Sequence, residues 1–168
     1  MMMDALTRLI AIEEIKQLKA RYFRCMDMKN WDEFRTVFHK DIVVDSSAAF
    51  TPVDFAGKPI EPGLPIVPHN PDFRVVGVDA FLEAEHHYLT NVSTVHHGHM
   101  PEIEILSETT AKGIWAMEDK LRYPQGNPTG AKWMHGYGHY WETYEKLTQG
   151  WVIKTLKLTR IRFDQELY

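Results

Sequence analysis

The sequence TVHHGHMPEIEILSETTAKGIWAMEDKLRY, residues 94–123, contains two extended segments separated by a polar turn. Residues 94–106 form the first segment, Ser107 to Thr110 the turn, and residues 112–123 the second segment. The second segment alternates between two sets of residues: Ile114, Ala116 and Glu118 against Trp115, Met117 and Asp119. A period of two is typical of a β-strand. The segments therefore predict two successive strands.

Two more strands are predicted on the C-terminal side of this stretch. Residues 134–147 and 151–163 pair across the turn Thr148-Gln149-Gly150, and residues 124–130 form a loop rich in Pro and Gly. Four long strands in succession, preceded by helices, predict an α+β fold with an antiparallel sheet.

Three helices are predicted on the N-terminal side. The first ends near Asp27, and either Asp4 or Thr7 caps its start. Its buried face recurs at steps of three and four: Ile15, Leu18, Tyr22 and Cys25. Its solvent face is expected to hold the charged residues: Glu13, Glu14, Lys16, Lys19, Arg21 and Arg24.

Asn30, with Glu33 three residues later, predicts the start of a second helix. That helix offers one apolar face, formed by Trp31, Phe34, Val37 and Phe38. Residues 42–44 predict a short buried strand, and residues 78–89 predict a third helix. The third helix presents Phe81, Ala84 and Tyr88 on one face.

The segment from Thr51 to Phe73 holds six of the nine prolines in the chain. Proline lacks a backbone donor, so this segment predicts a long and fairly stiff loop. Long ordered loops in compact domains often serve as lids or binding loops. A surface excursion or a subunit contact is an equally supported reading.

Composition excludes several classes of protein. The chain has 168 residues, 44% of them hydrophobic and 25% charged, which predicts one globular domain over residues 1–168. The net charge is −4 with no basic cluster, so we expect no nucleic-acid partner. We find no secretory signal and no membrane-length apolar run. The single cysteine, Cys25, fits a reducing compartment and predicts a cytoplasmic protein.

Two acidic residues are candidates for a functional site. Asp27 stands at a helix C-terminus, where a negative charge gains nothing in stability, so it is either solvated or buried with a partner. Asp119 shares a strand face with Trp115, Met117 and Leu121, so it must be paired or protonated if that face is buried. Its partner is predicted to be Arg160 or Arg162, which are expected to share a face of the last strand. The alternative is an exposed cross-strand ion pair, which would contribute little to stability.

The histidines of the first long strand divide between its two faces. His96 faces away from His97 and His99 because successive side chains alternate. A metal site would use His97 and His99, but no third ligand stands at a telling spacing, so we expect no metal. The remaining candidates are expected at the surface, a pocket rim or an interface: His86, His87, His135 and His139.

Several of these segments resemble the SnoaL-like (polyketide-cyclase-like) proteins of the nuclear transport factor 2-like superfamily. The opening of that family is similar to IKQLKARYFRCMDMKNWD (15–32) and FHKD (38–41). Its histidine strand and closing hairpin are similar to TVHHGH (94–99), EIEI (102–105) and GWVI (150–153). The resemblance covers nearly the whole chain and departs at the proline-rich loop and residues 126–132.

The resemblance implies a cone-shaped α+β barrel, in which N-terminal helices pack over a curved, mostly antiparallel sheet that encloses an apolar pocket. The pattern of Asp and His is similar to scytalone dehydratase, bile acid 7α-dehydratase and hexachlorocyclohexane dehydrochlorinase. The implied catalytic residues are Asp27, His96 and Tyr22, the last lying five residues before the aspartate. The implied substrate-binding residues are Asp119, Arg160 (with Arg162 as its rival), Tyr140 and Trp115.

The resemblance implies a cofactor-free dehydratase or related lyase acting on a mostly apolar cyclic substrate of polyketide, steroid or terpenoid type. Asp27 would orient His96, which would act as the base. An isomerase or cyclase using the same base is the first alternative. The second is a ligand-binding module, or a subunit like the small subunits of ring-hydroxylating dioxygenases. The implied assembly is a homo-oligomer, with a trimer favoured over a dimer.

Overall fold

The computed structural model describes residues 4–49 and 73–168. Its helices are α1 (Ala5–Asp27), α2 (Trp31–Arg35) and α3 (Val78–Leu89). Its strands are β1 (Phe38–Ala48), β2 (Arg74–Val76), β3 (Ser93–Ile105), β4 (Thr110–Arg122), β5 (Ala131–Leu147) and β6 (Gly150–Leu167). The predicted α+β class is confirmed. The predicted loop lies outside the described residues except for Phe73 at its end.

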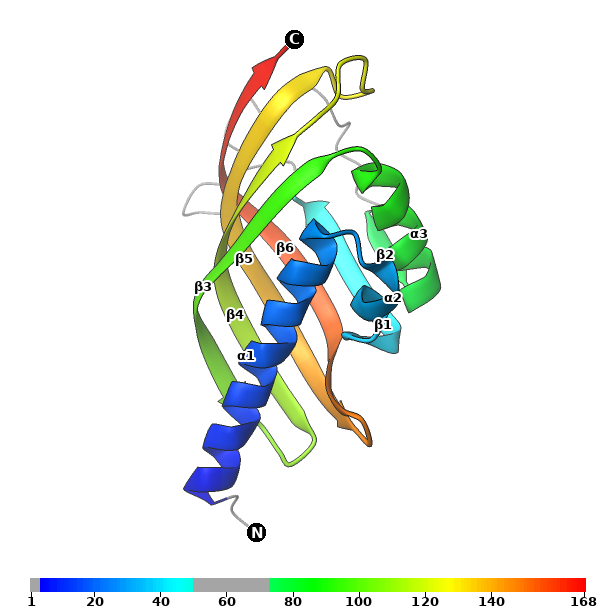
Figure 1. Ribbon diagram of the computed structural model, residues 1–168. Coiled ribbons are helices and arrows are strands. Elements are labelled where there is room, and N and C mark those ends of the chain that lie inside the picture. The colour runs from blue at the N-terminus through cyan, green and yellow to red at the C-terminus, as the bar shows by residue number, and fades with distance from the viewer. Residues whose placement is uncertain (1–3, 50–72) are drawn as a thin grey trace.

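All six described strands belong to one curved sheet in the order β2-β1-β6-β5-β4-β3. β1 runs parallel to β6, and every other neighbouring pair is antiparallel, so the sheet is mostly antiparallel as expected. The expected barrel is open, because β2 and β3 form two separate edges of the described sheet. The helices lie on the concave side of the sheet, and α1 runs across it (Figure 1).

The first helix begins and ends where its sequence directs it. Asp4 caps the start, accepting a hydrogen bond from the Thr7 backbone N–H at 3.0 Å. Lys29 adopts a left-handed conformation, with φ of 56°, just after the helix ends at Asp27. The predicted apolar face is buried. This packing fixes the end of α1 against the first residues of β3.

Lys19 corrects the prediction that it faces solvent. Its side chain is fully buried, one helical turn from both Ile15 and Tyr22. The helical repeat alone places it on the apolar face, and its charge misled the prediction. Glu142 on β5 supplies a carboxylate 2.5 Å from the Lys19 ammonium, which allows the charge to be buried.

The pairing of β5 with β6 contains a bulge that changes which side chains face inward. Arg162 lies opposite Tyr137, whereas Arg160 lies opposite Gly138, which leaves Ile161 as an extra residue. Residues 137 and 138 point to opposite faces of β5, so Arg160 and Arg162 do as well. The prediction that both arginines share a face is therefore wrong, because the bulge interrupts the alternation.

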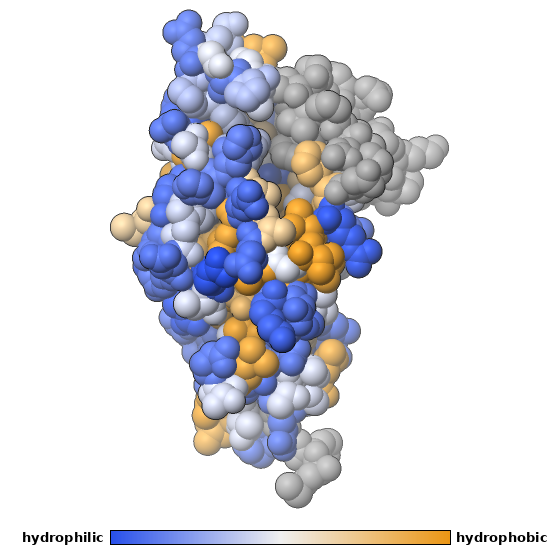
Figure 2. Space-filling model, turned by 90° about the vertical axis from the view of Figure 1, so that its right-hand side faces the viewer, coloured by the Kyte–Doolittle hydropathy of each residue, from blue (hydrophilic) through white to orange (hydrophobic). Residues whose placement is uncertain are grey.

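Element boundaries differ from prediction mainly at strand ends. β1 covers Phe38–Ala48 rather than residues 42–44 alone. The observed second helix, α2, ends at Arg35, so Phe38 belongs to β1 and not to that helix as predicted. β5 and β6 extend beyond their predicted bounds, and the three-residue β2 was not predicted. Seen from the side of α3, the surface is mostly polar with an apolar patch near its middle (Figure 2). The described helices lack the combination of length and apolar composition that a bilayer crossing requires.

Candidate active site

His96 and Asp27 meet where the C-terminal end of α1 packs against β3. His96 Nδ1 lies 2.6 Å from Asp27 Oδ1, and the His96 backbone N–H donates to Asp27 Oδ2 at 2.9 Å. One carboxylate thus orients both the ring and the backbone of residue 96. We assign the ring proton to Nδ1, the nitrogen beside the carboxylate, which leaves Nε2 as the basic nitrogen.

Thr94 and Lys29 support the same carboxylate. Thr94 Oγ1 donates to Asp27 Oδ1 at 2.9 Å, and Lys29 Nζ donates to Thr94 Oγ1 at 2.7 Å. Burial alone would raise the pKa of Asp27, but the hydrogen bonds from His96 and Thr94 together hold its pKa below the ordinary value. Asp27 is therefore ionised at neutral pH and able to accept the Nδ1 proton of His96.

A second acid, Asp119, lies on the other side of the His96 ring. Arg160 clamps it with two contacts, Nη1 to Oδ1 at 2.9 Å and Nη2 to Oδ2 at 2.5 Å. Both residues are buried, and Arg160 Nε also donates to the Ala49 carbonyl at 3.1 Å. His96 Nε2 lies 3.9 Å from Asp119 Oδ2, which is too long for a hydrogen bond but close enough to stabilise an imidazolium.

Gly136 makes room for this ion pair. A Cβ at residue 136 would lie 2.5 Å from Asp119 Oδ1 and 2.6 Å from Arg160 Nη1. The sequence reasoning did not single out Gly136 or Gly138, although both occupy the inward-facing series of β5. Glycine inside a strand often marks a close approach of other groups, so the run Gly136-Tyr137-Gly138 was the available signal.

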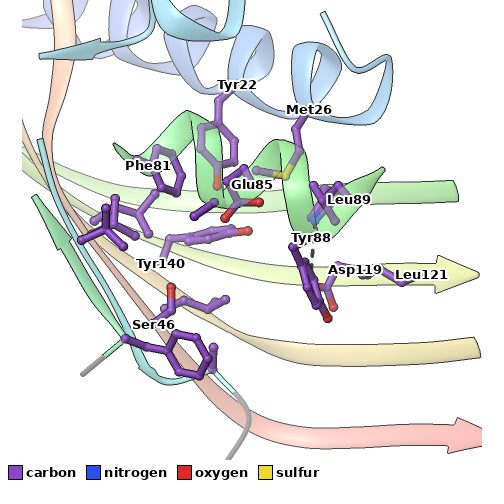
Figure 3. Close-up of a pocket in the computed structure, with 18 of the residues that line it drawn as sticks. Tyr22, Met26, Ser46, Phe81, Glu85, Tyr88, Leu89, Asp119, Leu121 and Tyr140 are labelled. Atoms are coloured by element: carbon purple, nitrogen blue, oxygen red, sulfur yellow. Dashed lines mark ion pairs between the residues drawn. The ribbon is translucent and has the colours of Figure 1, made fainter. Parts of the chain in front are cut away.

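A cavity of about 230 Å³ lies beside these groups. Its walls are largely apolar, and His96, Asp119, Arg160, Tyr22 and Tyr140 supply polar groups. The two tyrosines meet edge to face, with ring centroids 5.8 Å apart. Burial raises the pKa of both phenols, so their hydroxyls stay protonated and can donate hydrogen bonds. Figure 3 shows Tyr22 and Tyr140 facing the same space from α1 and β5.

A buried polar network lies behind the two tyrosines. Lys19 Nζ lies 3.8 Å from the ring centroid of Tyr22 and 3.7 Å from that of Tyr140. The Glu142 carboxylate bonded to Lys19 also accepts from Tyr144 Oη at 2.5 Å. These contacts hold both rings in place through their faces.

Trp115 belongs to this network rather than to the cavity. Its indole N–H donates to Tyr144 Oη at 2.8 Å, and its side chain is not part of the described cavity wall. The structure therefore brings together Asp27, His96, Tyr22, Asp119, Arg160 and Tyr140 of the predicted site residues, and it places Trp115 outside that group.

Glu85 on α3 is a cavity residue that the sequence reasoning missed. It lines the cavity together with Ala84, Tyr88 and Leu89, which lie on the same helix face. Burial raises the pKa of Glu85 to about 7, although the positive charges of His96 and Lys29 oppose this shift. The predicted inward face of the third helix, which included Ala84 and Tyr88, was the signal that could have identified it.

The other histidines lie away from the cavity. His97 Nδ1 and His135 Nε2 contact the two carboxylate oxygens of Glu118 at 3.3 and 2.7 Å on the outer face of the sheet. His99 is exposed on β3, and His86 and His87 are exposed on α3. The alternation of β3 thus separates His96 from His97, as predicted.

Comparisons with known proteins agree with this architecture. Residues 7–157 match the family described as the SnoaL-like domain. A protein of Gibberella zeae named "Probable cyclase FGR4" is 26% identical over 162 residues, covering 88% of this chain and 89% of that protein.

Two solved structures show the same fold. A Novosphingobium aromaticivorans protein named "Putative Scytalone Dehydratase" has a TM-score of 0.75 at 21% identity, covering 98% of this chain and 93% of that one. The hexachlorocyclohexane dehydrochlorinase LinA-type3 of Novosphingobium barchaimii has a TM-score of 0.70 at 15% identity, covering 97% of this chain and 94% of that one.

Proposed function

The chain belongs to the SnoaL-like domain family, and from this premise we propose that it is a cofactor-free lyase. The proposed reaction removes water, or a comparable leaving group, from a mostly apolar cyclic molecule. The names of two proteins with the same fold, "Putative Scytalone Dehydratase" and a hexachlorocyclohexane dehydrochlorinase, support elimination as the reaction class. The apolar cavity supports a ring-shaped substrate of low polarity.

One observation carries the proposal: Asp27 orients His96 at the wall of an apolar cavity. A histidine held through Nδ1 by a carboxylate keeps Nε2 as a base of fixed direction. Elimination needs a base directed at a carbon-bound proton. It needs no external oxidant or reductant, because the reaction is redox-neutral overall. The geometry therefore fits this chemistry with side chains alone.

The proposed steps use the groups in their observed places. His96 Nε2 removes a proton from the carbon next to a carbonyl, and Asp27 and Asp119 stabilise the imidazolium that forms. The protonated hydroxyls of Tyr22 and Tyr140 donate hydrogen bonds to the carbonyl oxygen as negative charge develops on it. The leaving group then departs and the new double bond forms.

A proton shift without elimination is the second candidate. The relative named as a cyclase favours it, because a cyclase can use the same base to form an enolate that attacks within the molecule. The two reactions differ in one observable: elimination lowers the mass of the organic product by the leaving group plus one hydrogen, whereas isomerisation or cyclisation alone leaves it unchanged.

The test is turnover of a panel of cyclic hydroxy ketones, including steroid and polyaromatic rings, with product masses recorded. The expected result is loss of one water from at least one substrate by the wild-type protein, and a greatly reduced rate in His96→Ala. Turnover that persists in His96→Ala would remove this base from the mechanism. Mass-neutral products that require His96 would establish the isomerase or cyclase instead.

A further inference from the structure

Elimination of water needs an acid as well as a base, because hydroxide is a poor leaving group. The steps above use His96 on carbon and the two tyrosines on the carbonyl oxygen, so the departing hydroxyl still lacks a proton donor. Burial raises the pKa of Tyr22 and Tyr140 above the ordinary value, which makes both weak acids. A group with a pKa nearer neutrality is better suited to this role.

Glu85 has the position that such an acid requires. It lines the cavity from α3, whereas His96 lines it from β3, so the two groups face the cavity from different elements. Figure 3 shows Glu85 beside Tyr22 and Tyr140, with its carboxyl group toward the same space. No residue within 4–49 or 73–168 forms a hydrogen bond or ion pair with the Glu85 carboxyl group.

The surroundings of Glu85 keep a proton available at neutral pH. Desolvation by the apolar walls raises its pKa to about 7. The titratable and charged groups that share its surroundings come from six elements and the turn after α1: Tyr22 and Asp27 (α1), Lys29, Tyr88 (α3), His96 (β3), Asp119 (β4), Tyr140 (β5) and Arg160 (β6). Among them His96 and Lys29 lower its pKa, yet less than desolvation raises it. Asp119 is committed to Arg160 and Asp27 to His96, which leaves Glu85 as the carboxyl group without such a bond.

We propose that Glu85 is the general acid of the elimination and gives its proton to the departing hydroxyl. The inference rests on the proposed lyase function. The C–H bond breaks as its proton passes to His96 Nε2, and its electron pair becomes the new double bond. The C–O bond breaks with its electron pair on oxygen, which takes the Glu85 proton and leaves as water. The imidazolium then loses its proton through solvent to the Glu85 carboxylate, which restores both groups.

The test compares two leaving groups on one ring: a cyclic β-hydroxy ketone that the wild-type protein turns over, and the matching β-chloro ketone. Chloride leaves without a proton. Glu85→Gln is therefore expected to lower kcat for water loss by about 10²–10⁴-fold and to change chloride loss by less than about fivefold. His96→Ala is the matched control, because loss of the base slows both reactions. Equal slowing of both substrates by Glu85→Gln, or no slowing of either, would overturn the role of Glu85.

A second measurement separates this inference from the proposed function. Should the wild-type protein turn over no compound of the panel, the lyase proposal fails, and binding of a cyclic β-methoxy ketone, whose ether oxygen accepts a hydrogen bond and donates none, then tests the protonation of Glu85. A protonated Glu85 donates to the methoxy oxygen, so affinity should fall at least fivefold between pH 6 and pH 8.5. Glu85→Gln keeps a donor that does not titrate, so its affinity should change much less over the same pH range. Identical profiles for the two proteins would overturn the inference whatever the activity.

Discussion

Arg160 and Arg162 stand two residues apart on β6, yet they lie on opposite faces of the sheet, because Ile161 is an extra residue in the pairing with β5. Arg160 is buried and clamps Asp119, whereas Arg162 is exposed and pairs with its neighbour Asp164. One bulge thus decides which arginine completes the candidate active site and which belongs to the surface.

The two arginines therefore form a matched pair for mutation. Arg160→Ala leaves Asp119 buried without its partner, and we expect it to lower the free energy of unfolding by about 3–5 kcal/mol. Arg162→Ala is expected to change it by no more than about 0.5 kcal/mol, because exposed ion pairs contribute little. Urea denaturation of the two variants measures both values. Similar losses in both would show that the bulge does not divide the arginines in solution.

Gly136 is expected to tolerate no side chain. In Gly136→Ala, the new Cβ would lie 2.5 Å from Asp119 Oδ1, so the ion pair must shift. We expect a loss of about 1–3 kcal/mol of stability together with a loss of turnover. Gly113→Ala is the milder comparison: its Cβ would lie 3.2 Å from the Tyr144 ring and 3.3 Å from the Glu102 carbonyl oxygen, so its neighbours must shift less and its loss of stability should be smaller. A Gly136→Ala protein with wild-type turnover would contradict the geometry of the Asp119–Arg160 pair.

The buried Lys19–Glu142 pair calls for a double-mutant cycle. Lys19→Met and Glu142→Gln each leave a partner without its counter-charge or hydrogen bond, and each is expected to cost about 3–5 kcal/mol of unfolding free energy. The double variant removes both charges, so its loss should be clearly smaller than the sum of the single losses. Additive losses from chemical denaturation would indicate that the two side chains do not interact.

Periodicity in the sequence predicted the helices and long strands because burial on one face determines them. The bounds of α3 and the end of α1 at Asp27 follow from apolar steps of three and four and from local turn chemistry. Lys19 was placed in solvent because of its charge, although the helical repeat puts it on the apolar face, and the partner that allows its burial, Glu142, lies 123 positions away in the sequence. A pairing of that kind depends on the folded sheet, and no local pattern encodes it.

The candidate site divides in the same way. Positions such as Asp27 and His96 were found through their resemblance to a family, and the structure brings them within hydrogen-bonding distance. The choice between Arg160 and Arg162 was left open, since one bulged residue is not visible in a strand pattern. Glu85 was missed because a glutamate on a helix is usually solvated, although it adjoins the predicted inward residues Ala84 and Tyr88, and it lines the cavity with them.

Asp27 is expected to act on chemistry through the orientation of His96. Asp27→Asn removes the charge that holds the Nδ1 proton, so we expect kcat to fall by about 10²–10⁴-fold with the fold retained. His97→Ala, the neighbouring exposed histidine, is the control and should keep wild-type turnover. Steady-state kinetics and circular dichroism measure the two properties. Undiminished turnover in Asp27→Asn would exclude an orienting role for this carboxylate.

Glu85 also predicts a pH dependence of stability. Its pKa is about 7 in the folded protein against 4.5 ordinarily, so the folded state binds more protons between these values. The free energy of unfolding should therefore fall by up to about 3 kcal/mol as pH rises from about 4.5 to 7, with no further change above. Denaturation at pH 5 and pH 8 should show this difference in the wild type and less of it in Glu85→Gln. The same difference in both proteins would assign the effect to another group.

Three residues of interest lie on one helix, α1. Lys19 pairs with Glu142 in the buried polar network, Tyr22 lines the cavity, and Asp27 contacts His96. A shift of one residue in the register of α1 against the sheet would rotate all three side chains together by roughly 100° about the helix axis. The position of α1 on the sheet therefore determines the positions of the Asp27 carboxylate, the Tyr22 phenol and the Lys19 ammonium at the same time. Folding of the chain and assembly of the candidate active site therefore occur together.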